Sequence, residues 1–295
     1  MRSLRHFFVG VSLLALMDVT AHGQAPIPQS QRSAIAYGDN PAAGAYAEVN
    51  GIRLYYETYG AGHPLLILHG NGGSMGDLSE QIRYFGTHYR VIATDSRGHG
   101  KSGLGTDHLT YEQMADDLAV LLHQLHVPPV DVLGCSDGGI LGLLLAIHHP
   151  ECVDRLAVMG ANTDPLGAQD WALALVKSEG QRVDAKIARG DKTESWALYR
   201  QYLNLLGKQP HIPTRDLHRI AAPTLVMASD KDVIRADHTQ MIFENIPHAQ
   251  LCIFPGATHL VEVTDPGLFN FTVDKFFTQP FNRPDTKDVI TQLAP

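Results

Sequence analysis

Short apolar runs alternate with longer segments of helical spacing over most of this chain, and this alternation is the feature that most constrains its fold. Each run has the length of a strand, and several of the segments between runs place apolar residues every three or four positions. Such alternation builds a parallel sheet that helices cover on both faces. The predicted strands span 65–68, 90–94, 130–134, 155–159, 223–227 and 251–254, and the predicted helices span 78–87, 111–126, 138–149 and 265–277.

Two further strands precede this alternation. Residues 46–49 and 52–58 flank Asn50-Gly51, which is a strong hairpin signal because both turn residues tolerate a positive φ. The sequence therefore predicts an α/β fold in which an antiparallel hairpin opens a mostly parallel, doubly wound sheet.

The alternation is interrupted at residues 161–215, where the spacing is helical throughout. We expect this segment to form a cap over the carboxyl ends of the strands, where open α/β sheets bind their ligands. The α/β core then comprises residues 46–160 and 216–277. The cap carries four candidate substrate-binding residues: Trp171, Trp196, Tyr199 and Tyr202. Part of this surface must serve the packing of the cap itself, and the rest should form an apolar wall that favours uncharged, medium-sized substrates.

The N-terminus has the pattern of a signal peptide over residues 1–23. Arg2 and Arg5 precede an apolar stretch at 7–17, and a small-x-small cleavage sequence follows at 21–23. The apolar stretch is shorter than the ~20 residues that a membrane-spanning helix needs. We therefore expect a secreted or periplasmic protein that has no membrane anchor once the signal is removed.

Two segments show no periodic pattern. Residues 24–45 are rich in Ala, Pro, Gln and Gly, which is typical of a flexible leader, and residues 278–295 form a tail without a usable pattern.

The net charge of -8 argues against a nucleic-acid partner, because such a partner needs a basic face. Cys135, Cys152 and Cys252 are too few and too far apart for a disulfide framework, and we expect all three to be buried.

The clearest chemical motif is Gly134-Cys135-Ser136-Asp137-Gly138. It is a G-x-S-x-G element between an apolar strand and a helix, the context in which a sharp turn exposes the serine hydroxyl above the sheet. A Gly-rich turn without chemistry is the alternative, but the strand before the motif and the helix after it favour a nucleophile at Ser136.

A serine nucleophile needs a base, and the base needs an orienting acid. His259 follows the predicted strand 251–254 through a turn of small residues, so it can reach the carboxyl end of the sheet. The preceding strand is followed by Asp230 and Asp232, and spacing alone does not choose between these two acids.

The oxyanion of a tetrahedral intermediate needs N–H donors. The glycine loop at 69–73 follows the strand 65–68, so the backbone amide of Asn71 is one candidate, and the amide of Asp137, directly after the nucleophile, is the other.

Taken together, these motifs resemble the α/β-hydrolase family, in particular its ester-hydrolase and perhydrolase-like branch. The resemblance covers about 46–277 and rests on the glycine loop, the segment 95–102, the serine elbow, the Asp-Lys-Asp group and Gly256-Ala257-Thr258-His259. It implies that Asp232 is the acid of the triad and that 95–102 is a structural turn. Serine at the elbow differs from dehalogenases and epoxide hydrolases, which carry aspartate there.

The elbow also resembles that of valacyclovir hydrolase, in which an acidic residue after the nucleophile helps to select α-amino esters. Here Cys135 stands where that protein has a bulky Trp. Asp137 therefore either selects cationic substrates or only complements the positive end of its helix.

These observations predict a serine hydrolase that cleaves a small or medium-sized carboxylic ester and needs no metal or cofactor. The same triad also suits lactone opening, carbon–carbon hydrolysis or perhydrolysis, and a non-catalytic binding protein that keeps the pocket is a further alternative. The sequence does not define the oligomeric state.

Overall fold

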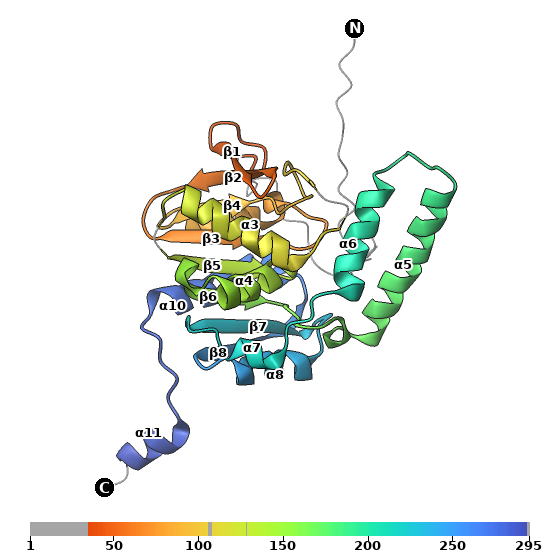
Figure 1. Cartoon of the computed structure of the whole chain (residues 1–295). Helices are drawn as coiled ribbons and strands as arrows, with labels where there is room; N and C mark the ends of the chain where they lie inside the picture. Colours follow the sequence, from red (N-terminus) through yellow and green to blue (C-terminus); the bar gives the residue numbers. More distant parts are fainter. Residues whose placement is uncertain (1–34, 106–107, 128, 294–295) are drawn as a thin grey trace.

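The computed structural model describes residues 35–105, 108–127 and 129–293, and its centre is an eight-stranded sheet. The strand order is β1-β2-β4-β3-β5-β6-β7-β8, with antiparallel pairing of β1 with β2 and of β2 with β4 and parallel pairing elsewhere (Figure 1). The predicted fold class is thus confirmed. The strands are β1 Gly44–Val49, β2 Ile52–Tyr59, β3 Pro64–Leu68, β4 Arg90–Thr94, β5 Val130–Cys135, β6 Val153–Met159, β7 Thr224–Lys231 and β8 Ala249–Thr258.

Helices cover both faces of this sheet, and each face has its own apolar core. One core is formed with α3, α4, α7 and α8, and the other with α2, α9 and α10. The helices of the α/β core are α2 Ser79–Phe85, α3 Tyr111–Gln124, α4 Asp137–His148, α7 Thr214–Leu217, α8 Ala236–Asn245, α9 Val261–Thr264 and α10 Pro266–Thr278, with 3-10 turns η2 Met75–Leu78, η3 Pro150–Cys152 and η4 Pro165–Gly167. The strands between these layers are buried on both sides, which explains their almost continuous apolar sequence.

The hairpin turn forms as the sequence predicts. Val49 pairs with Ile52, and the two residues between them, Asn50 and Gly51, have φ values of 41° and 82°. Both values lie in the left-handed region that a two-residue hairpin turn requires.

The prediction of a flexible leader at 24–45 is wrong for its last residues. The N–H groups of Gly38 and Asn40 donate to the carboxylate of Glu57 at 2.7 and 2.9 Å, and β1 begins at Gly44 rather than Tyr46. Glu57 is fully buried, and a buried carboxylate must be hydrogen-bonded, so it fixes the chain that passes over it.

Two long helices, α5 Asp170–Ala188 and α6 Trp196–Lys208, are inserted between β6 and β7. They lie side by side at the end of the sheet that the parallel strands point toward (Figure 1). This is the segment that the sequence predicts as a cap, and α5 follows η4, while α6 leads into α7.

The remaining expectations concern the termini and the cysteines. The predicted signal peptide at 1–23 lies outside the described residues. None of the described helices is long and apolar enough to cross a membrane. The tail contains α11 Thr286–Leu293, which stands apart from the sheet in Figure 1.

All three cysteines are free, but Cys252 is partly exposed, contrary to expectation, because it lies on the edge strand β8.

Candidate active site

Ser136 lies at a sharp turn with no loop between strand and helix. β5 ends at Cys135 and α4 begins at Asp137, while Ser136 has φ 55° and ψ −120°, a strained conformation for a residue with a side chain. A Cβ atom at Gly134 would overlap the carbonyl of Gly138, and one at Gly138 would overlap the carbonyl of Leu68 at the end of β3. The two glycines of the motif are therefore required by close backbone contact, and the turn is held in a shape that presents the serine hydroxyl.

His259 lies directly after β8 and bridges Ser136 to Asp232. In the tautomer that a carboxylate partner requires, its Nδ1–H donates to Asp232 Oδ1 at 2.6 Å and its Nε2 accepts from Ser136 Oγ at 3.0 Å. The structure thus brings together three residues that are distant in the sequence in the hydrogen-bond relay of a nucleophile, base and orienting acid.

Asp232 is held as a carboxylate. Besides His259, the N–H groups of Ser229 and Ile234 donate to it at 3.1 and 3.0 Å. Burial by itself raises the pKa of Asp232, but the bond from His259 and these two backbone bonds outweigh burial, and the pKa is lowered. The other candidate, Asp230, is exposed, and among the described residues its carboxylate accepts the N–H of Gly256 at 2.9 Å, so it serves the turn.

The electrostatics of His259 suit a base. Burial by itself lowers the pKa of His259, but the hydrogen bond and the charge of Asp232 outweigh burial and raise it above the ordinary histidine value. A raised pKa means that the imidazole binds the serine proton firmly, and also that it is already protonated, and unable to act as a base, at lower pH.

The two residues predicted to supply oxyanion donors are joined through their side chains. Asn71 Nδ2 donates to Asp137 Oδ2 at 2.8 Å, and the hydroxyl of Tyr111 donates to the same oxygen at 2.6 Å. Within the described residues, the backbone N–H groups of Asn71 and Asp137 donate to no other group. The side-chain contacts therefore fix two unpaired amides beside the nucleophile, which is the arrangement that an oxyanion needs.

Tyr111 is the residue at this site that sequence reasoning missed. It begins α3 and is fully buried, and it meets Asp137 across 26 positions of the chain. Nothing in the local spacing marks such a contact. A buried acid at Asp137 could have prompted a search for a donor, but the sequence does not show that Asp137 is buried.

A partly open cavity of about 60 Å³ lies between the cap and the sheet and includes Ser136, His259 and Asp137 in its wall. Apolar side chains from α5 and α6 form much of the rest, and none of the described residues in the lining is a Lys or Arg. The cap segment contributes Asn162, Ala168, Trp171, Ala172, Leu173, Leu175, Val176, Leu206 and Gln209, and the core contributes Tyr111, Gly160, Val233 and Ile234.

Of the four aromatic cap residues predicted to bind substrate, only Trp171 lines this cavity. Trp196 and Tyr199 pack against each other at 6.3 Å between ring centres, and Arg182 of α5 lies over the Trp196 ring. Tyr202 stacks on His99, 4.3 Å away. The structure thus places these three side chains outside the lining of the cavity, because helical periodicity does not say which face of α6 meets α5 or the core and which meets the cavity.

Two groups of side chains in the described part of the chain could hold a metal ion, His123 with Glu151 and Cys152 and His63 with Asp131 and Asp154. Neither group includes a residue of the cavity described above.

Comparison with known proteins agrees with this architecture. A family model described as alpha/beta hydrolase fold matches residues 63–204. 3-Oxoadipate enol-lactonase 2 of Acinetobacter baylyi is 29% identical over 76% of this chain and 92% of its own, and serine hydrolase BPHL of Homo sapiens is 26% identical over 82% and 89%. A hydrolase structure from Pseudomonas aeruginosa superposes with a TM-score of 0.69 at 24% identity, covering 81% of this chain and all of that one, which supports the fold alone.

The chain has the α/β-hydrolase fold, and its sequence is similar to members of that family, as its motifs indicate. It is a hydrolase.

Proposed function

We propose that this hydrolase cleaves the carboxylic ester bond of a small, uncharged substrate through an acyl-enzyme intermediate. The observation that carries this proposal is the relay from Ser136 through His259 to Asp232, with distances of 3.0 and 2.6 Å, opening into the apolar cavity.

The mechanism follows from the geometry. Ser136 Oγ attacks the ester carbonyl as its proton passes to His259 Nε2, and the carbonyl oxygen becomes an oxyanion that the amides of Asn71 and Asp137 stabilise. Collapse of this intermediate breaks the ester C–O bond, and His259 returns the proton to the departing alcohol. Water then attacks the acyl-enzyme by the same steps and releases the carboxylic acid and free Ser136.

The lining of the cavity supports an uncharged substrate. Because it contains no Lys or Arg, a substrate carboxylate would lose its hydration without gaining a cationic partner. Asp137 is a weak candidate for a selector of cations, because its Oδ2 atom is already bound by Tyr111 and Asn71. Burial raises the pKa of Asp137, because the charged form of the carboxyl group loses hydration there.

A lactone is the second candidate substrate. It is a cyclic ester, so the same steps open it, and the relative from Acinetobacter baylyi is named an enol-lactonase. A panel of neutral linear esters and neutral lactones of matched size, compared by kcat/KM, separates the two candidates.

The proposal is tested with an organophosphonate probe and with Ser136→Ala. We expect the probe to add one label to the protein at Ser136, and Ser136→Ala to lower kcat for the best ester by about 10⁶, as for triad serines generally. Asp265→Ala, at the N-cap of α10, is a folded control that should keep both labelling and rate. A chain that neither reacts with the probe nor hydrolyses any neutral ester or lactone would be a binding protein rather than an esterase.

A further inference from the structure

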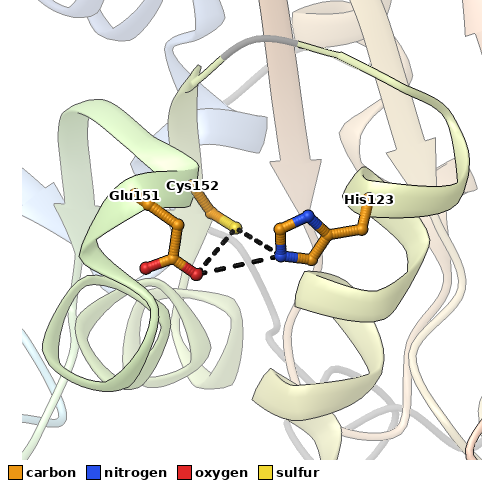
Figure 2. A group of neighbouring side chains, drawn as sticks. All are labelled: His123, Glu151 and Cys152. Atoms are coloured by element: carbon orange, nitrogen blue, oxygen red, sulfur yellow. Dashed lines mark hydrogen bonds and ion pairs between the residues drawn. The ribbon is translucent and has the colours of Figure 1, made fainter.

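A second group of reactive side chains lies at the opposite end of α3 and α4 from the cavity. His123 is in the last turn of α3, and Glu151 and Cys152 are in η3, directly after α4. Figure 2 shows the three side chains directed toward one another. The imidazole and the carboxylate are exposed, whereas the thiol is buried. The cluster therefore opens to solvent on one side only.

The spacing of the donor atoms fits a small metal ion. Cys152 Sγ lies 3.9 Å from His123 Nε2 and 3.9 Å from Glu151 Oε1, and the latter two are 3.8 Å apart. The three atoms form a nearly equilateral triangle, whose centre lies at the side length divided by the square root of three from each corner. A metal ion at this centre would be about 2.2 Å from each of the three atoms. Zinc takes sulfur at ~2.3 Å, imidazole nitrogen at ~2.0–2.1 Å and carboxylate oxygen at ~2.0–2.2 Å. Shifts of a few tenths of an ångström therefore suffice to form the three bonds.

A neighbouring histidine, His149, lies beside Glu151 but outside the group of three residues whose donor atoms are within 4.8 Å of one another. His149 Nδ1 is 3.8 Å from Glu151 Oε1, so it approaches the cluster, while its Nε2 is 2.8 Å from Asp116 Oδ1. Histidines that bind metals commonly hold a carboxylate with their second ring nitrogen, which fixes the tautomer and the ring orientation. Asp116 and His149 already have this relation.

The electrostatic surroundings favour a cation. The cluster lies where α3 and α4 end, and the unpaired carbonyl groups of a helix C-terminus attract positive charge. Burial, with the charge of Glu151, raises the pKa of the Cys152 thiol to about 11, so without an ion the sulfur carries its proton. When an ion binds, the S–H bond breaks, the proton passes to solvent and the thiolate bonds to the metal.

We propose that Cys152, His123 and Glu151 hold a structural zinc ion, that His149 moves toward it as the fourth ligand, and that this site joins the C-terminal ends of α3 and α4. The set of one thiolate, two imidazoles and one carboxylate is typical of zinc rather than of Mg²⁺ or Ca²⁺, which prefer oxygen ligands. The site has no part in ester cleavage. It acts as a brace between the two helices whose first residues, Tyr111 and Asp137, meet at the cavity.

Zinc binding to the tag-free, reduced full chain tests the proposal by competition with a chromophoric chelator. We expect one ion per chain with a dissociation constant below about 1 μM. His123→Ala, at an exposed position that should not disturb folding, is expected to weaken binding at least about tenfold, and Asp116→Asn about 10–100-fold, as for other carboxylates behind a metal-bound histidine. His63→Ala, in the second group of candidate ligands, is the matched control and should bind like the parent.

Cobalt gives a readout that is specific for sulfur. One equivalent of Co²⁺ should produce thiolate-to-cobalt charge-transfer absorption that Cys152→Ser abolishes and Cys252→Ser keeps. Zinc should also raise the unfolding temperature of the parent by more than it raises that of His123→Ala. The proposal is overturned if one equivalent of zinc fails to bind, if His63→Ala rather than His123→Ala removes binding, or if bound cobalt shows no sulfur band in the parent protein.

Discussion

Replacing Tyr111 by Phe isolates the contact that holds the floor of the cavity. The substitution removes only the hydroxyl that donates to Asp137 Oδ2 at 2.6 Å, and both residues are buried, with exposures of 0% and 4%. Among the described residues, the Asp137 carboxylate then keeps the bond from Asn71 Nδ2. A lost hydrogen bond to a buried charged group costs about 1.5–3 kcal/mol.

This free-energy cost corresponds to a measurable decrease in the unfolding temperature. At about 2–4 °C for each kcal/mol, a loss near 2 kcal/mol lowers the unfolding temperature by about 4–8 °C. The control is Tyr56→Phe, because the Tyr56 hydroxyl makes no hydrogen bond within the described part of the chain, and it should unfold close to the parent temperature.

The pH dependence of the stability difference between Tyr111→Phe and the parent protein is a more specific test of this hydrogen bond. Burial raises the pKa of Asp137 and the Tyr111 bond opposes this, so Tyr111→Phe should raise the pKa further. A raised carboxyl pKa in the folded state means that stability falls as pH rises from the unfolded value, about 3.9, to the folded value. The difference between Tyr111→Phe and the parent should therefore be largest at pH 8 and shrink toward pH 4 in calorimetric scans. A difference that is absent, or the same at both pH values, would refute a hydrogen bond to an ionised Asp137.

Three other predictions concern the triad, the cap and the N-terminus. Asp232→Asn should lower kcat by about four orders of magnitude, the effect of losing the orienting acid in a serine protease, while Asp230→Asn keeps it; the reverse order would exchange their roles. Trp171→Ala should change the ratio of kcat/KM between short and long acyl chains by about tenfold, whereas Tyr199→Ala should leave it unchanged; equal effects would mean that the cavity wall does not read the substrate. In an exporting bacterial host, N-terminal sequencing of the mature protein should begin at Gln24, and an intact N-terminus would contradict a cleaved signal peptide.

The sequence was most informative where chemistry imposes a local pattern. Ser136 was identified because a strained turn needs glycine on both sides, and this requirement is visible in five consecutive residues. Among the sixteen histidines, His259 stands out because it follows a predicted strand through a turn of small residues. The choice of Asp232 over Asp230 came from the family resemblance, since two acids in one turn look alike until their partners are known.

The sequence does not predict which distant segments of the chain contact each other. The bond from Tyr111 to Asp137 depends on how α3 packs beside α4, and the ordering of Gly38 and Asn40 depends on the buried carboxylate of Glu57. The packing of the aromatic residues of α6 is hidden from the sequence for a related reason. Their spacing shows that they share a helix, but only the packing of α6 shows which of them face α5.

The two walls of the cavity differ in how strongly the rest of the molecule constrains them. α4, which carries the floor, has every residue from Asp137 to Ile147 buried, whereas α5, which carries much of the roof, buries only Gly180 and Val183 among its nineteen residues. Substitutions in α4 must preserve close packing, while most positions of α5 accept change at little cost in folding. A new substrate preference can therefore arise by mutation in the roof while the reaction machinery below it is inherited intact.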